Sequence, residues 1–525
     1  MLGGKLEFAP ARTEGWVGTH SFAWGRMDNR FIFIGGRCDG LHARQPFRSF
    51  PGENQLPGVT VWDMETGDVT WRPWEGLADS ISAQLQGSNA AFQQVGAHLL
   101  FAGGYSYAAH LDEHLTHPRL LVLDLGAMLD ALDAGLPLPG PVAMDSDARW
   151  AVTGGRMGWV GSGAHRSWVL VGGHRFDGRY NPIGRPTYTQ TYTEEVQPFL
   201  WDLENGVRWL PAWRDGVHLH RRDFNWLQQV LPGGDWGGWI SAGVFQHDVD
   251  LPFSHPVDIG PEGYRALTNQ KQQLNQYHTA CVSLFSAKDS VQHALFFGGM
   301  SLLTQVEGEW RLDTDVPFND HLGWMQRKVG GEGGAWKEYL RSERTPFLGG
   351  AAAEFLLHPD VPSHAPGIVE WDAVRDGEAD AVLLGYVVGG IQSAWGNPFA
   401  YNMTEDTEAS GGIWEVWWHR DGGVEVAEYI KSSAPPGTWR WEWEDERRTK
   451  LYLYLTLEEP STFRYHLTDA GGNRFQWGTW EPLGAGEHWL EIDVESGPPG
   501  DWNLTGVLWD THFNTLCIER QPPYD

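Results

Sequence analysis

Three histidines stand at the starts of short apolar segments, where their side chains could bind a transition metal. The segments read GTHSFAWG, HLHRRDFNW and NQYHTACV, and they contain His20, His220 and His278. Three imidazole nitrogens that meet at one point make a transition-metal site. The alternative is that each histidine bonds to neighbouring backbone at the start of its strand. The sequence leaves both interpretations open, and we expect no cofactor apart from such a metal.

The segment HRRDFN, which begins at His220, is the most polar of these stretches in a chain with only 38 Lys and Arg residues. Adjacent residues on a strand point to opposite faces, so only one of Arg221 and Arg222 can face a given pocket. A guanidinium there could bind a carboxylate or phosphate with two hydrogen bonds. Alternatively, an arginine forms a buried ion pair in which Asp223 or Glu354 ties neighbouring elements together.

Polar side chains with aromatic neighbours also gather in three loops. They are Arg37, Asp39 and His42 in the first loop, Arg179, Tyr180 and Asn181 in the second, and Gln246 in the third. Sites for sugars or polar peptides use such mixtures of polar and aromatic groups. Long loops also need polar groups to satisfy their own backbone, and the sequence does not decide between the two roles.

The elements that must position these residues are revealed by an internal repeat. A short apolar strand that ends in a glycine pair recurs as FIFIGGR, LLFAGGY, WVLVGGH, LFFGGM and YVVGGI, with a degraded copy, WISAGVF. The second glycines lie at positions 36, 104, 173, 243, 299 and 390, at intervals of 68, 69, 70, 56 and 91 residues. Further strands precede and follow each pair, so each unit contains about four strands.

Four-stranded units of this kind predict an all-β fold, a six-bladed β-propeller with a small β-sandwich at its C-terminal end. The glycine doublets, with aromatic residues after them, resemble kelch repeats, so we expect a kelch-like propeller. A single sheet cannot bury its faces alone, so the units must stack around an axis. We expect the propeller over residues 16–431, after a lead segment of residues 1–15. The inserted loops follow the glycine pairs, so they gather on one face, called here the loop face.

The C-terminal part of the chain has a different pattern. The stretch SSAPPGTW predicts a linker at residues 432–439. Beyond it, apolar and polar residues alternate and turns recur every eight to twelve residues, which is typical of a small β-sandwich over residues 440–525.

The overall charge limits the classes of partner. The formal net charge is −30, which argues against a nucleic-acid backbone or an anionic membrane surface as partner. Three cysteines cannot form a disulfide framework, and no apolar run is long enough for a transmembrane segment.

Several longer strings resemble one family. SFAWG, IGGRCDGLHARQPFRSF, GRYNPIG, HRRDFN, GVFQHDVDLPF and NQYHTACVSLFSA resemble kelch-type proteins that are exported by the type IX secretion system, over about residues 16–430. The later strings LTDAGGNRF, LGAGEHWLEIDV and GPPGDWNLTGV resemble the type A C-terminal sorting domain of that system. The resemblance implies a propeller fold and an extracellular or cell-surface location, and it implies no particular reaction.

The pair Tyr277-His278 resembles the Tyr-His ligand pair of copper radical oxidases, which also combine a propeller with a β-sandwich. That chemistry further needs a cysteine cross-linked to a second tyrosine, and Cys38 follows its glycine pair instead of lying on an inner strand. The set of residues is therefore incomplete.

We expect a non-catalytic protein that binds a protein or glycan partner at the cell surface through its loop face, and that forms part of a surface assembly. The alternative is a metal-dependent, copper oxidase-like enzyme, or a carbohydrate-active enzyme, with its site at the mouth of the propeller channel. In either case the inner strands and the inserted loops must supply the site.

Overall fold

The computed structural model describes most of the chain and, in its C-terminal region, the strands alone. The described residues are 4–43, 48–181, 186–247, 249–306, 309–315, 317–329, 334–399, 404–420, 426–427, 438–444, 450–459, 462–469, 474–480, 487–493, 503–510 and 515–518.

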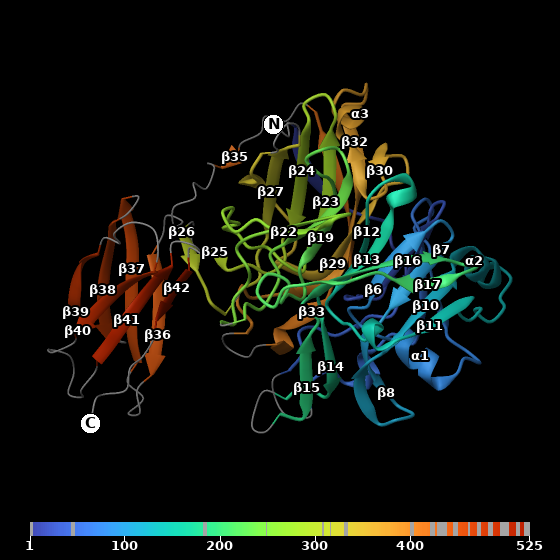
Figure 1. Cartoon of the computed structure of the whole chain (residues 1–525), viewed down its shortest axis with the longest axis horizontal. Coiled ribbons are helices and arrows are strands. Elements are labelled where there is room, and N and C mark those ends of the chain that lie inside the picture. Colours follow the sequence, from blue (N-terminus) through green and yellow to red (C-terminus); the bar gives the residue numbers. More distant parts are fainter. Residues whose placement is uncertain are drawn as a thin grey trace.

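Six antiparallel sheets follow one another along the chain and form the blades of a propeller (Figure 1). The strands of each blade are given from the innermost outwards. The first blade consists of β2 (Ala23–Met27), β3 (Arg30–Ile34), β4 (Gly58–Asp63) and β5 (Val69–Pro73), and the second of β6 (Ala91–Val95), β7 (His98–Ala102), β10 (Arg119–Asp124) and β11 (Ala143–Ser146). The third consists of β12 (Arg156–Val160), β13 (Ser167–Val171), β16 (Glu195–Asp202) and β17 (Gly206–Trp209), with β18 (Trp213–Arg214) paired to β16. The prediction of an all-β, six-bladed propeller is confirmed.

The last three blades follow the same order with additions at their edges. The fourth blade consists of β19 (Asn225–Val230), β20 (Trp236–Ser241), β21 (Val257–Gly260) and β22 (Gly263–Ala266). The fifth consists of β23 (Ala280–Ser286), β24 (Val291–Phe297), β27 (His321–Lys328) and β28 (Lys337–Arg344), extended by β35 (Val426–Ala427). The sixth consists of β29 (Gly349–Leu357), β32 (Ala381–Ser393), β34 (Ile413–His419) and β1 (Lys5–Pro10), with β33 (Thr407–Ala409) paired to β32.

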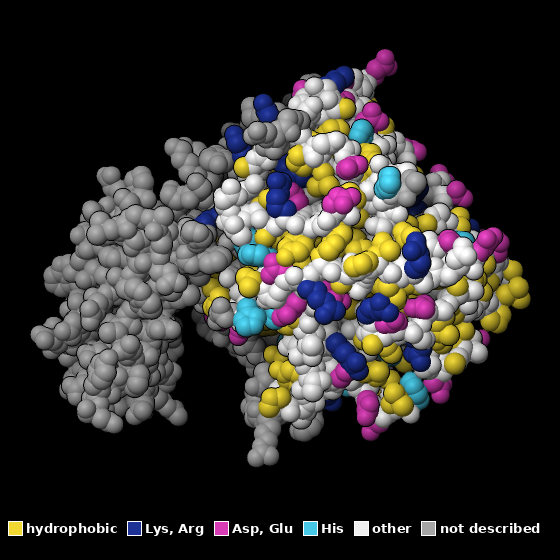
Figure 2. Space-filling view, viewed as in Figure 1, with side chains coloured by type: hydrophobic (Ala, Val, Ile, Leu, Met, Phe, Trp, Pro, Cys, Tyr) yellow, Lys and Arg dark blue, Asp and Glu magenta, His cyan; other side chains and the backbone are white. Residues whose placement is uncertain are grey.

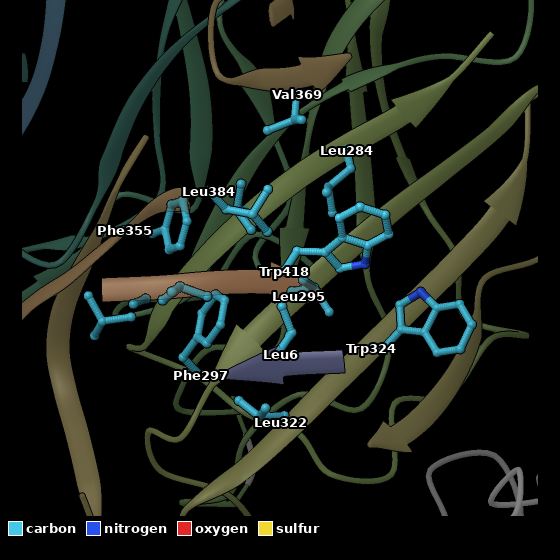
Figure 3. Packing of buried hydrophobic residues seen from close by; sticks show 14 of the residues in the cluster. Leu6, Leu284, Leu295, Phe297, Leu322, Trp324, Phe355, Val369, Leu384 and Trp418 are labelled. Atoms are coloured by element: carbon cyan, nitrogen blue, oxygen red, sulfur yellow. The ribbon is translucent and has the colours of Figure 1, made fainter. Parts of the chain in front are cut away.

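The N-terminal strand closes the ring. The expectation that residues 1–15 form a lead segment is wrong, because β1 pairs with β34 and is the outermost strand of the sixth blade. Leu6 is 2 % exposed and lies among side chains of the fifth and sixth blades, including Leu295 and Trp418 (Figure 3). The two ends of the ring are thus joined by backbone pairing and by shared apolar burial.

Insertions after the glycine pairs form hairpins on the loop face. They are β8 (Tyr105–Ala108) with β9 (Glu113–Thr116), β14 (His174–Gly178) with β15 (Tyr188–Tyr192), and β25 (Leu303–Val306) with β26 (Glu309–Leu312). The helices are α1 (Asp79–Leu85), α2 (Leu125–Asp133) and α3 (Trp371–Arg375), with 3-10 turns η1 (Gly52–Asn54), η2 (Ala148–Trp150), η3 (Gly163–His165) and η4 (Thr404–Asp406).

The glycine pairs recur because the neighbouring blade leaves no room for a side chain. Gly103 has φ +66°, and a Cβ there would lie 2.1 Å from the carbonyl oxygen of Val152, just before the third blade. In the degraded copy, Ala242 takes the place of the first glycine and still has φ +50°. The pair therefore combines left-handed backbone with close packing between blades.

One insertion reaches the inner edge of a neighbouring blade. Between β29 and β32, the chain forms β30 (Ser363–Ala365) and β31 (Ile368–Glu370), and β31 pairs in parallel with β23 of the fifth blade. Because β31 pairs with residues 283–285, in the second half of the inner strand β23, the inserted segment lies at the end of the channel opposite the loop face.

The C-terminal region contains two antiparallel sheets, which is the strand content that a small β-sandwich requires. Their strands are β36 (Thr438–Glu444), β37 (Lys450–Glu459), β38 (Thr462–Asp469) and β39 (Arg474–Trp480), and β40 (Glu487–Asp493), β41 (Asn503–Asp510) and β42 (Thr515–Ile518). The predicted linker falls largely outside the described residues, which resume at residue 438.

Candidate functional site: the propeller axis

Six residues with left-handed backbone form a ring around the axis, one just before or within the inner strand of each blade. Their φ angles lie between 50° and 67°. Five backbone N–H···O hydrogen bonds of 2.6–3.3 Å join them from blade to blade. The ring consists of Ser21, Asn89, Gly154, Asp223, His278 and Ala352. The pair Tyr277-His278 is therefore one copy of a structural element that every blade repeats.

The six residues that immediately precede the ring residues in the sequence form a second layer around the axis, on the side of the loop face. In five blades this residue forms a β-bridge with the residue that directly follows the glycine pair, or its degraded copy, in the same blade. The bridges are His20 to Arg37, Ser88 to Tyr105, Thr153 to His174, Arg222 to Val244, and Tyr277 to Met300. Three of the predicted site residues, His20, Arg222 and Tyr277, thus occupy equivalent places around the axis.

In the first blade, His20, Arg37 and Asp39 form a charged cluster. Arg37 donates two hydrogen bonds to the Asp39 carboxylate, of 2.8 and 2.6 Å, and Nε2 of His20 lies 3.7 Å from the same carboxylate. Burial lowers the pKa of His20. Although burial alone would raise it, the nearby His20 ring and the hydrogen bonds from the Arg37 guanidinium hold the pKa of Asp39 well below its usual range. This carboxylate stays charged at any ordinary pH.

The first and second predicted loops meet in an aromatic cluster. The rings of His42, Phe50 and Tyr180 lie side by side, with His42 at 4.8 Å from each of the other two centroids. Arg179 donates a 2.7 Å hydrogen bond to the carbonyl oxygen of Ser49, so it ties the two loops together. Asn181, at the end of this segment, is buried. Loops far apart in the sequence thus build one surface.

The two adjacent arginines have different surroundings. Arg221 is wholly buried and donates to the carbonyl oxygens of His218, Ala242 and His255. Its side chain holds the loop that follows the fourth blade's glycine, which is a structural role. Burial lowers the pKa of Arg221 to about 9.

Arg222 instead lies toward the axis. It donates to the hydroxyl of Tyr192, lies 4.9 Å from the ring of Phe245, and is 3.4 Å from the Asp223 carboxylate. The tyrosine belongs to the β14–β15 hairpin of the preceding blade, so Arg222 joins two blades at the loop face.

His220 and Gln246 lie on the outer side of Arg222. Nδ1 of His220 is 2.7 Å from the Glu194 carboxylate, and its ring stacks on Tyr192 at 3.8 Å. The side-chain amide of Gln246 donates to the carbonyl oxygen of Pro252, so this residue satisfies its own loop.

The three histidines proposed as metal ligands are not brought together. His20 contacts Asp39, His220 contacts Glu194, and His278 lies 3.3 Å from the Asn89 side chain. Within the part of the chain that the structure describes, no group of three or more His, Cys, Asp or Glu side chains is arranged to hold a metal ion.

Tyr277 packs into an apolar cluster beside the axis. It is 4 % exposed, among side chains that include Ala242, Met300 and Phe318. Burial strongly raises the pKa of its hydroxyl. This environment favours the neutral phenol over a charged phenolate.

Sequence reasoning missed a cavity at the other end of the channel. Inner-strand side chains and the insertion before β31 enclose about 610 Å³. Trp24, Phe92 and Trp226 line it, and each stands three residues after its blade's ring position. The equivalent residue of the fifth blade is Cys281, which also lines it. An alignment of the repeat on the ring positions would have revealed this spacing.

An ion pair separates this cavity from the ring. Arg156 of the third blade and Glu354 of the sixth meet at 2.7 Å, and both line the cavity as well as the small hollow inside the ring. That hollow measures about 10 Å³, room for about one water molecule. The loop face and the cavity are thus two separate places at which a ligand could bind.

Charges of both signs are interspersed over the face of the propeller drawn in Figure 2. Among the described residues, no helix is long and apolar enough to cross a membrane. Comparison with protein-family models and with curated proteins gave no match.

Proposed function

We propose that this protein is a binding protein that recognises a protein or glycan partner through the loop face of its propeller. The observation that carries the proposal is that insertions from different blades meet there. The His42–Phe50–Tyr180 cluster joins the first and third blades, and the Arg222–Tyr192 contact joins the third and fourth. Aromatic and arginine side chains are the groups that most often dominate binding energy at protein interfaces.

A second part of the proposal concerns location. The resemblance of several strings to kelch-type substrates of type IX secretion, and of the C-terminal strings to a sorting domain, supports an extracellular or cell-surface protein within a surface assembly. Fractionation of host cells that produce the full chain, or a chain that ends before residue 438, tests it. We expect the full chain outside the cell and the shortened chain to be retained. Retention of both inside the cell contradicts this location.

The binding role is tested with two tryptophans of similar exposure. Trp395 lies in the loop after β32, on the loop face, and is 55 % exposed, whereas Trp71 lies on the outermost strand of the first blade and is 50 % exposed. Partners are first identified with a glycan array and with pull-down from surface proteins of the host.

We expect Trp395→Ala to weaken the identified interaction about tenfold or more, since a central aromatic contact contributes about 1–3 kcal/mol. Trp71→Ala serves as the matched control and should leave the affinity unchanged. Equal losses in both variants, or binding retained in both, would show that the loop face is not the recognition surface.

A further inference from the structure

The 610 Å³ cavity opposite the loop face has the size of a small-molecule site. The inner strands run away from the ring toward its mouth, where Arg26 at the end of β2 and Gly367 before β31 form part of the rim. Its floor is the Arg156–Glu354 pair. The space is therefore a pocket with a polar base.

The charges on its wall are opposite in sign to the protein as a whole. Three guanidinium groups line the cavity, those of Arg26, Arg156 and Arg166, and among its lining residues only Glu354 carries a carboxylate. Glu354 neutralises Arg156. Arg26 and Arg166 form no ion pair with any carboxylate of the described chain, and Arg26 donates to the backbone carbonyl of Asp28. Against a net charge of −30, this excess of positive charge favours an anionic ligand.

Aromatic side chains supply the apolar part of the wall. Trp24, Phe92 and Trp226 are each half-buried, as is expected for rings that border an open space. Glycines leave room for the largest of them, since a Cβ at Gly238 would lie 2.0 Å from the Trp226 ring and one at Gly158 would lie 2.4 Å from it. A flat apolar ligand face could lie against these rings.

Two buried polar atoms in this wall have no partner within the described residues. They are the hydroxyl oxygen of Ser283, a residue that is 2 % exposed, and the indole Nε1 of Trp24. A buried polar group without a partner costs about 1–3 kcal/mol, so such atoms in a cavity wall indicate a missing acceptor. Neighbouring atoms cover both groups, so a ligand with hydroxyl or ring oxygens would reach them once the adjacent side chains shift.

We propose that this cavity binds a small acidic sugar, a ring with hydroxyl groups and one carboxylate. The carboxylate interacts with Arg26 and Arg166 at the mouth, the apolar face of the sugar ring lies against the aromatic side chains, and its oxygens accept from Trp24 and pair with Ser283. The site is independent of the partner proposed for the loop face, from which the Arg156–Glu354 pair separates it.

Calorimetric titration of the full chain with D-glucuronate, D-glucose and D-glucosamine tests the ligand class. We expect D-glucuronate to bind, with an affinity that falls as salt is added, because exposed charges are screened. D-Glucose lacks the carboxylate and should bind at least tenfold more weakly, and cationic D-glucosamine more weakly still. Equal binding of glucose, or no binding of glucuronate, overturns the proposal, and binding of benzoate alone would show an aromatic-acid site instead.

The variant Ser283→Ala removes one unpartnered atom, and Trp24→Phe removes the other together with the five-membered ring that carries it. Because the Ser283 hydroxyl has no partner in the fold, we expect unchanged or slightly higher thermal stability for Ser283→Ala. Trp24→Phe also shortens a ring that packs on Phe31 and Phe92, so a small loss of stability is expected there. Both variants should bind glucuronate about 3- to 10-fold more weakly. A loss of stability without a loss of affinity would show that the groups serve the fold, and would overturn their assigned role.

A matched pair of arginines tests the mouth. Arg166 lies over Trp159 and Trp168 at the cavity, whereas Arg149 lies over Trp209, outside it. Arg166→Gln should weaken glucuronate binding about 3- to 10-fold and reduce its salt dependence, and Arg149→Gln should change neither.

Cys281 lines the cavity, whereas Cys38 is exposed elsewhere, so labelling of Cys281 reports occupancy. Burial raises the pKa of the Cys281 thiol to about 12, so the reaction is slow and is followed at alkaline pH until the sugar-free protein is measurably labelled. Glucuronate should slow maleimide labelling of the Cys281 peptide, read by mass spectrometry, and leave the Cys38 peptide unaffected. Equal labelling rates with and without glucuronate at saturating concentration would place any bound sugar elsewhere.

Discussion

Arg156 and Glu354 lie on opposite blades, the third and the sixth, and their side chains meet at 2.7 Å across the propeller axis. Each is about one-fifth exposed, and they are 198 residues apart in the chain. The pair joins two inner strands that share no backbone hydrogen bonds with each other and forms the floor of the cavity.

This pair should show measurable coupling in a double-mutant cycle. With Arg156→Met and Glu354→Gln, we expect a coupling energy of about 1–3 kcal/mol in urea unfolding. The Arg30–Asp133 pair, 31 % and 53 % exposed, is the control and should give less than about 1 kcal/mol. Equal coupling in the two pairs would contradict a special role for the axial pair.

Ring closure should depend on the N-terminal strand. Leu6→Ala removes a side chain that is 2 % exposed and should lower the free energy of unfolding by about 2–5 kcal/mol. The control Val17→Ala changes a residue that is 62 % exposed and should have an effect within about 0.5 kcal/mol. A negligible effect of Leu6→Ala in urea unfolding would show that β1 does not contribute to the closed ring.

Substitutions of the two adjacent arginines should have different effects, on stability for Arg221 and on partner binding for Arg222. Arg221→Met removes the donor to three carbonyl groups, two of them in buried hydrogen bonds, and should lower the melting temperature by several degrees. Arg222→Met should have a smaller effect on melting and should weaken binding of the loop-face partner. The reverse assignment, with Arg221→Met stable and defective only in binding, would contradict the positions of the two side chains.

Glu338 should make stability fall as the pH rises. Burial raises the pKa of Glu338 from 4.5 to about 7, although backbone N–H groups of Gln273 and Leu274 donate to its carboxylate and would lower it. The folded state therefore holds this proton more tightly than the unfolded state. Its stabilising contribution is fully present below about pH 4.5 and is lost as the pH rises through about 7.

Glu338→Gln removes this titration and retains the carbonyl oxygen as acceptor. Relative to the variant, the wild-type free energy of unfolding should fall by roughly 3 kcal/mol between pH 4.5 and pH 8. Urea unfolding at four pH values measures the difference, and buried histidines contribute equally to both proteins. Parallel curves would show that the carboxyl titrates normally.

The sequence located the strand starts and loops around the axis, but one residue of register decided how their side chains lie. His20 and His278 both stand at strand starts, yet His278 lies in the left-handed ring and His20 one level above it. His220 lies farther out, with Glu194 and Tyr192. A strand start can be read from a pattern, whereas the direction of each side chain depends on the dihedral angles at that turn.

The amino-acid sequence by itself determined six all-β blades and the face on which their loops gather. It could do so because each blade needs a glycine pair at the same turn, and a residue that every blade needs recurs in the sequence at the spacing of the blades. Only the tertiary structure decided that residues 5–10 complete the last blade, that Arg156 meets Glu354, and that Trp24 and Ser283 line one cavity. These contacts join residues far apart in the chain, and their distances are set by the closure of the ring, which no local pattern encodes.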